Sequence, residues 1–300
     1  MIDQPMLIQD VDISEMEDGY RSARHATHAR AIAILLYIAT CLFSGTHALA
    51  EQVQVVTSNT AYADIARQIG GGAVAVSVID SPRVAASSVR PKSIVLCGWA
   101  RTDAPLRDAA RRALPNTTLI ELPLPAPGVP VSIDLPWYDT ASISELARTY
   151  ADQLMRIQPS LALQFAGNLI RMREGLGTID RRTKEIAKDY ANSEVIAADP
   201  LSRAIATKLG FEAVGPTAAG KISAKSANDL KKSIESREGS IFLYESDAAN
   251  PDFKDLVALA KRNGIPVVAL QDKLPPRLRY QQWVLRQWNT IHGALNEASP

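Results

Sequence analysis

The chain has 300 residues, of which 46% are hydrophobic and 22% charged, and its formal net charge is +1. This is the composition of a globular protein that buries a real core. A charge so close to zero argues against a surface that binds nucleic acid or acidic membranes, so we expect no nucleic-acid partner.

The first fifty residues have the pattern of an export signal. Arg21, Arg24 and Arg30 precede an apolar run at 31–43, and small residues follow up to Ala50. A basic segment, an apolar segment and a small-residue end are typical of a secretory signal peptide. The apolar run is shorter than the roughly 20 residues that a membrane-spanning helix needs. We therefore expect cleavage after Ala50 and a periplasmic protein.

Removing this segment changes the charge of the chain and the number of histidines and cysteines. Residues 1–50 hold three of the four histidines, one of the two cysteines, three arginines and six acids, which leaves residues 51–300 with a net charge of +4. Cys97 and His292 are then the remaining cysteine and histidine. No intramolecular disulfide is possible. A zinc site is built mainly from His and Cys and takes at least three protein ligands, so a conventional histidine-ligated zinc is not expected.

The next segment, 51–141, alternates between strands and helices. Such alternation predicts a parallel sheet with helices on its faces. A proline-rich stretch at its end, 123–136, predicts an extended connection. The expected strands are 53–57, 74–79, 94–97 and 118–122, and the expected helices are 62–69 and 105–114.

Helical periodicity dominates residues 142–191. Pro159 begins a second helix that continues to Ala191. At about 1.5 Å per residue it would be about 45 Å long, which is longer than one small lobe requires. We expect it to join two lobes.

The alternation then resumes over residues 192–300. The sequence therefore predicts an α/β protein of two lobes, 51–141 and 192–300, each with a mostly parallel sheet flanked by helices, joined through the helical region 142–191. The expected strands are 194–197, 212–214, 240–244 and 266–270, and the expected helices are 201–209, 226–235, 252–262 and 280–295.

Several short motifs resemble one family when they are read in order. They are Val55–Ser58 with Tyr62–Ala66, Asp134–Tyr138, Ala204–Phe211, Ile241–Glu245 and Val267–Asp272. With this order and spacing the chain resembles the periplasmic solute-binding proteins of zinc- and manganese-type ABC importers. The resemblance implies a ligand cleft between the lobes, a metal or small solute as cargo, an ABC permease of the inner membrane as partner, and a monomer.

The chain departs from that family at the ligand positions. The resemblance implies three histidines, one of them sometimes Glu, and one aspartate. Arg83 stands where the first histidine would follow a proline, and the second and third would fall near Leu135 and Ala198. Asp272 matches the family's aspartate. The resemblance thus implies an atypical member that lacks most of the metal-ligand histidines.

The candidate ligand residues are Arg83, Asp199, Glu245 and Asp272. Ligands of open α/β sheets bind beyond the carboxyl ends of strands, where Glu245 and Asp272 are expected, and we assign these two to a metal. Asp199 precedes Pro200, so its carboxylate is either a helix cap or a ligand. One hypothesis has the three acids hold a hard cation together. Arg83 would instead attract an anionic solute or a metal chelate.

These features favour an extracytoplasmic solute-binding protein of an ABC importer of the metal-uptake type. Its site would be non-standard, for a hard cation, a metal chelate or a small anionic solute. No G-x-S-x-G, P-loop or dinucleotide fingerprint occurs, so no enzyme is expected. Beyond such a metal ion, the sequence identifies no cofactor. The alternative is a non-transport periplasmic protein that binds a partner, or acts as a chaperone, on a degenerate binding-protein fold.

Overall fold

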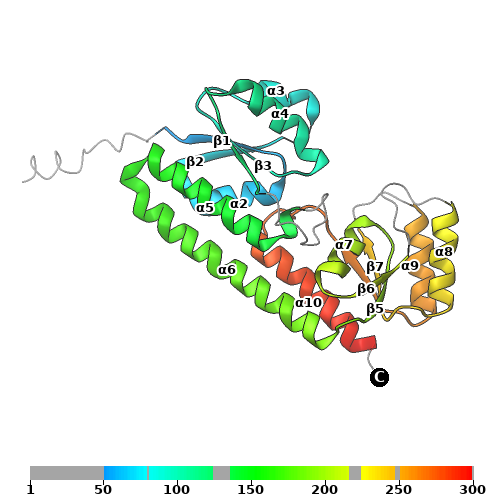
Figure 1. Ribbon diagram of the computed structural model, residues 1–300. Coiled ribbons are helices and arrows are strands. Elements are labelled where there is room, and N and C mark those ends of the chain that lie inside the picture. The colour runs from blue at the N-terminus through cyan, green and yellow to red at the C-terminus, as the bar shows by residue number, and fades with distance from the viewer. Residues whose placement is uncertain (1–50, 80, 124–135, 216–223, 247–250, 299–300) are drawn as a thin grey trace, which may run out of the picture. The chain divides into compact units, whose positions relative to one another are not determined.

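The computed structural model describes residues 51–79, 81–123, 136–215, 224–246 and 251–298, which lie within one unit of the chain, Glu51–Pro300. The predicted signal peptide and the position of Leu135 fall outside these ranges. Within them, no helix combines the length and the apolar character that crossing a membrane requires. Two sheets of four strands each organise this unit (Figure 1).

The first sheet is parallel throughout, in the order β2-β1-β3-β4. Successive side chains of a strand point to opposite faces. Val55 accordingly belongs to the cluster with helix α2, and its neighbour Val56 to the cluster with α3 and α4. The elements are β1 (Val53–Thr57), β2 (Val74–Val78), β3 (Ile94–Cys97), β4 (Thr118–Glu121), α2 (Thr60–Gly70), α3 (Pro82–Ser88) and α4 (Ala104–Ala113).

The second sheet repeats this arrangement in the order β6-β5-β7-β8, again with parallel pairs. Val195 and Leu243 join the larger core cluster, whereas Ile196 and Phe242 face the cluster beneath α8 and α9. The elements are β5 (Glu194–Ala197), β6 (Glu212–Val214), β7 (Phe242–Glu245), β8 (Val267–Leu270), α7 (Pro200–Lys208), α8 (Ala224–Glu235) and α9 (Pro251–Arg262).

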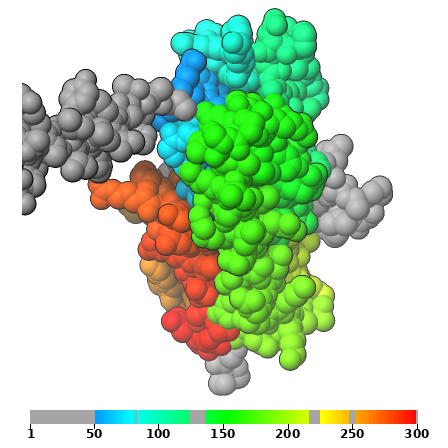
Figure 2. Space-filling view, turned by 90° about the vertical axis from the view of Figure 1, so that its left-hand side faces the viewer, coloured from blue at the N-terminus to red at the C-terminus, as the bar shows by residue number. Residues whose placement is uncertain are grey.

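Three long helices share one core with the two sheets. They are α5 (Thr140–Ile157), α6 (Ala162–Asp189) and α10 (Tyr280–Ala298). Helix α6 has 28 residues, about 42 Å at about 1.5 Å per residue, and it packs against α2, α5 and α10. Figure 2 shows the green surface of α5 and α6 beside the red surface of α10. One continuous cluster of buried side chains runs from the first sheet through these helices to the second sheet.

The predicted fold class is confirmed: two parallel, helix-flanked sheets and one long helix. The boundaries of the lobes stay a prediction. Helix α3, at Pro82–Ser88, was not expected from the sequence. It is seven residues long and begins with a proline, which suits a first helical turn, but its side chains show no extended apolar periodicity.

Candidate functional site

The carboxyl ends of the parallel strands are where the fold can place a ligand. In the first sheet, Ser58 follows β1 and Gly98 follows β3. In the second sheet, β7 ends at Glu245 and Asp272 comes two residues after β8. The short 3-10 turn η3 (Pro136–Tyr138) precedes α5, and its Tyr138 makes a hydrogen bond to Gln271, the residue after β8.

Tyr138, Gln271 and Gln287 form a closed ring of hydrogen bonds. The Tyr138 hydroxyl donates to the carbonyl oxygen of Gln271 at 2.8 Å and accepts from Nε2 of Gln287 at 2.7 Å. The amide N–H of Gln271 donates to Oε1 of the same Gln287 at 2.8 Å. Both backbone groups of Gln271, the residue before Asp272, are therefore fixed by buried side chains.

Both acidic candidates of the second sheet lie near this ring. Burial raises the pKa of Tyr138 well above its ordinary value, the hydrogen bond from Gln287 lowers it, and the negative charges of Asp272 and Glu245 raise it further. β7 and β8 are adjacent parallel strands with Glu245 opposite Leu270, so Glu245 and Asp272 lie at the same edge of the sheet. Both are half-buried, so each keeps some access to solvent.

Asp199 has the capping role that was one of its two predicted alternatives. Its Oδ1 accepts the N–H of Ser202 at 2.8 Å, the hydroxyl of Ser202 accepts the N–H of Asp199 at 3.0 Å, and its Oδ2 accepts the N–H of Glu245 at 2.7 Å. Burial raises the pKa of Asp199, and these backbone hydrogen bonds lower it. Because both oxygens already accept backbone hydrogens, Asp199 supports Glu245 and is not a good direct ligand.

The hypothesis of a cation held jointly by Asp199, Glu245 and Asp272 is not borne out. In the described ranges, no three His, Cys, Asp or Glu side chains are grouped so that they could hold a metal ion. The capping role of the Asp199 carboxylate gives the physical reason. A smaller metal site of Glu245 and Asp272 stays a prediction.

Arg83 belongs to the first sheet, whereas these acids follow strands of the second. It is an exposed residue in the first turn of α3, just beyond the carboxyl end of the edge strand β2. Its role in ligand binding therefore also stays a prediction.

Neither His292 nor Cys97 offers a metal ligand at the strand ends. His292 lies in the last turns of α10, where its ring packs edge-on against Tyr190 at 5.7 Å and one ring nitrogen lies 3.3 Å from Asn296. Burial, followed by the charge of Asp103, raises the pKa of Cys97 to about 12, so this thiol stays protonated at neutral pH. A protonated thiol is not a metal ligand.

The first sheet carries a buried polar cluster that sequence reasoning did not find. Asp103 is 0% exposed, and its Oδ2 accepts the N–H of Gly98 at 2.9 Å. A Cβ atom on Gly98 would lie 2.2 Å from the Tyr62 hydroxyl and 2.7 Å from Oδ2 of Asp103, so only glycine fits there. Burial raises the pKa of Asp103, whereas the nearby Ser58 side chain and backbone N–H groups, that of Gly98 among them, lower it. The glycine after the β3 strand was the signal available in the sequence.

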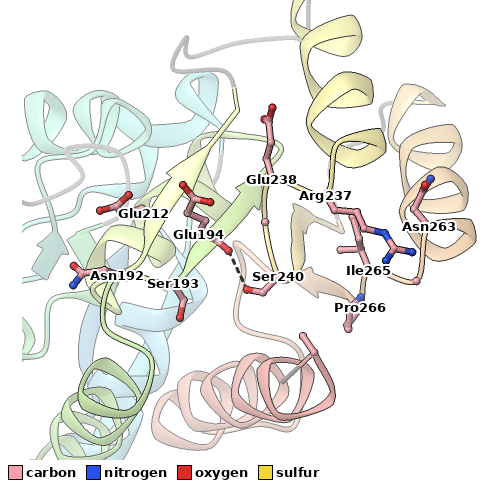
Figure 3. A pocket seen from close by; sticks show the side chains of 13 residues that line it. Asn192, Ser193, Glu194, Glu212, Arg237, Glu238, Ser240, Asn263, Ile265 and Pro266 are labelled. Atoms are coloured by element: carbon pink, nitrogen blue, oxygen red, sulfur yellow. Dashed lines mark hydrogen bonds between the residues drawn. The ribbon is translucent and has the colours of Figure 1, made fainter. Parts of the chain in front are cut away.

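A hollow of about 640 Å³ lies at the opposite, amino ends of the second sheet (Figure 3). Glu194, Glu212 and Glu238 line it, and the Ser240 hydroxyl donates to the backbone oxygen of Glu194 at 2.9 Å. The three glutamates are exposed, and the place is away from the strand ends where parallel sheets bind ligands. We therefore assign the candidate site to the carboxyl ends.

The sequence matches the model of a known protein family. Its model, described as zinc-uptake complex component A, periplasmic (ZnuA), matches residues 136–294. This range begins at the Pro136–Tyr138 turn and includes Asp199, Glu245 and Asp272. No curated protein matches the sequence significantly.

Solved structures share the fold at low sequence identity. The periplasmic zinc-binding protein TroA from Treponema pallidum has a TM-score of 0.65 and 16% identity, over 81% of this chain and 99% of that one. The Zn(II)-bound ZnuA-like domain of AdcA from Streptococcus pneumoniae has a TM-score of 0.63 and 14% identity, over 82% and 99%. FpvC from P. aeruginosa, solved with Ni²⁺, has a TM-score of 0.62 and 13% identity, over 83% and 99%. At these identities the likeness establishes the fold alone.

Proposed function

Because the chain belongs to the ZnuA family of periplasmic zinc-uptake components, we propose that it is an extracytoplasmic solute-binding protein of an ABC importer. It captures its cargo at the carboxyl ends of the strands and presents the loaded form to a permease in the inner membrane. The export signal that the sequence predicts at 1–50 agrees with this location. The proposal includes no enzymatic step.

The cargo that suits the site is a hard cation, either hydrated or carried in a chelate. Glu245 and Asp272 supply carboxylate oxygens, the ligand type that hard cations prefer. His292 packs at the far end of α10 and Cys97 is a buried thiol, so the softer ligands of a usual zinc site are not at these strand ends. Two carboxylates leave coordination positions that water or an organic chelator fills. Arg83 would attract the anionic part of a chelate.

The observation that carries this proposal is the buried ring around Tyr138. It fixes the backbone of Gln271, directly before Asp272, and β8, which leads to Asp272, pairs with β7, which ends at Glu245. A pair of half-buried carboxylates next to a rigid support is a preorganised place for a cation.

The packing between the sheets favours small movements during capture. Gln68 and Gln281 exchange hydrogen bonds between α2 and α10 at 2.9 and 3.1 Å, and the N–H of Tyr280 donates to Oδ2 of Asp64 at 2.8 Å. These contacts tie the first sheet's helix to the helix that follows β8. We propose that cargo capture adjusts the strand-end loops rather than opening a wide hinge.

Native mass spectrometry with metal analysis of the protein purified from the periplasm tests the proposal. We expect a chain that starts at Glu51 and carries a metal ion or a metal chelate. After metal removal, calorimetric titration with Ca²⁺, Mn²⁺ and Tb³⁺ should give binding that Asp272→Asn and Glu245→Gln each weaken at least tenfold. Glu297→Gln, an exposed acid on α10, is the matched control and should leave binding unchanged.

Two results would contradict the proposal. One is a protein that carries nothing and gives no heat with any of the three cations, which would favour the partner-binding alternative. The other is tight binding that neither Asp272→Asn nor Glu245→Gln affects, which would place the site elsewhere.

A further inference from the structure

The hydrogen-bonded ring described above holds the backbone of Gln271, directly before Asp272. Gln287 and Tyr138 are each 5% exposed. The three hydrogen bonds of the ring measure 2.7 to 2.8 Å. Tyr138 and Gln287 stand 149 positions apart in the sequence, so only the folded chain brings them together.

We propose that Tyr138 and Gln287 are positioning residues that set the affinity of the site for its cation by fixing Gln271 and, through it, Asp272. This inference rests on the proposed function and deepens it, because it names the residues that hold the ligand-bearing strand end without touching the cargo.

The aromatic side chain of Tyr138 is also held in place by packing. It packs against Trp283 at a centroid distance of 5.3 Å and stacks on Trp288 at 5.8 Å. Both tryptophans are fully buried on α10, the helix that also carries Gln287. Tyr138 and Gln287 therefore form one rigid support, and the strand end of β8 is the part that the support holds.

Loss of the Tyr138 hydroxyl has a defined consequence. The carbonyl of Gln271 loses its donor, and Nε2 of Gln287 loses its acceptor, in a place where water does not easily replace either. A buried polar group left without a partner is costly, so the 271–272 segment should shift until these groups find other partners. Asp272 then leaves its bound position, and cation affinity falls although every carboxylate is still present.

The test uses three single variants of the whole exported protein. Tyr138→Phe removes the hydroxyl and keeps the ring that packs on the two tryptophans. Gln287→Met keeps the length of the side chain and removes both amide contacts. Tyr150→Phe is the control, because it removes another fully buried tyrosine hydroxyl, from α5, that makes no hydrogen bond to the residues that the structure describes.

Two measurements are made on each variant. Titration with Tb³⁺ by calorimetry gives the dissociation constant, and hydrogen–deuterium exchange without any cation gives the protection of the Gln271 amide. We expect Tyr138→Phe and Gln287→Met to raise the dissociation constant at least tenfold, and Gln287→Met to speed exchange at Gln271 at least tenfold. Tyr150→Phe should change either quantity less than twofold.

Two other outcomes would contradict the positioning role or the proposed function. If the wild-type protein binds Tb³⁺ and the folded Tyr138→Phe and Gln287→Met variants bind it within twofold, the positioning role is wrong and the proposed function stands. If the wild-type protein binds none of Tb³⁺, Ca²⁺ and Mn²⁺, the proposed function fails, and the positioning role fails with it.

Discussion

At the scale of single residues, the two buried carboxyls Asp103 and Asp199 are the notable groups. Each is buried at a strand end and accepts backbone N–H groups, from Gly98 in the first case and from Ser202 and Glu245 in the second. Burial raises the pKa of both, and the hydrogen bonds offset only part of that effect. They have similar roles, since each carboxylate fixes the backbone at the carboxyl end of a strand.

The raised pKa of Asp103 predicts how stability depends on pH. The unfolded carboxyl ionises near its ordinary pKa of about 3.9, and the folded one ionises at higher pH. The contribution of Asp103 to stability is therefore complete below pH 4 and is lost as the pH rises through the folded pKa. Asp103→Asn does not ionise, so its stability relative to wild type should improve between pH 4 and pH 7, as measured by urea unfolding.

Asp108→Asn, an exposed acid on α4, is the control and should show no such trend. A stability difference between Asp103→Asn and wild type that stays constant from pH 4 to pH 7 would contradict the assignment of the raised pKa to Asp103.

At the scale of elements, α6 is a helix with one buried face. Phe165, Met172, Leu176, Ile179 and Ile186 are buried along it, at the spacing of a helical stripe. Leu163 lies on the opposite side and is 91% exposed. The helix therefore depends on its packing against α2, α5 and α10 more than on its own sequence propensity.

Paired alanine substitutions on α6 test this dependence. Leu176 is 3% exposed, so Leu176→Ala should cost about 2–5 kcal/mol of unfolding free energy, because it leaves a cavity in the core. Leu163→Ala, on the exposed side, should stay within about 0.5 kcal/mol of wild type. Chemical denaturation gives both values, and equal effects of the two substitutions would rule out the assigned inner face.

At the scale of the whole described unit, the two sheets share one core. The largest cluster of buried side chains includes Val55 and Ile94 from the first sheet, Leu176 from α6, and Leu243 and Val268 from the second sheet. A core that is shared in this way couples the unfolding of the two sheets.

We therefore expect residues 51–300 to unfold in one transition. The urea curve from far-UV circular dichroism should coincide with the curve from tryptophan fluorescence, since Trp99 and Trp137 report on the first half of the chain and Trp283 and Trp288 on α10. Two separated transitions would show that the sheets are independent folding units, joined by α6 alone.

Much of the fold follows from local patterns in the sequence. The alternation of short apolar runs with helical stripes predicted both sheets, and proline, glycine and capping residues predicted where most elements begin and end. Helix α3 was not predicted, because its seven residues show too little apolar periodicity to indicate a helix. The two strand-end acids, Glu245 and Asp272, were found because the end of a predicted strand is itself a local feature.

The sequence by itself determined the alternation of strands and helices, the long helix, and the single histidine and single cysteine of residues 51–300. These depend on composition and on residues a few positions apart. Only the tertiary structure decided that Asp199 caps α7, that Asp103 is buried beside Gly98, and that Tyr138 and Gln287 hold Gln271. The contact of Tyr138 with Gln271 joins residues 133 positions apart, and no local pattern encodes a contact that depends on how two distant segments pack.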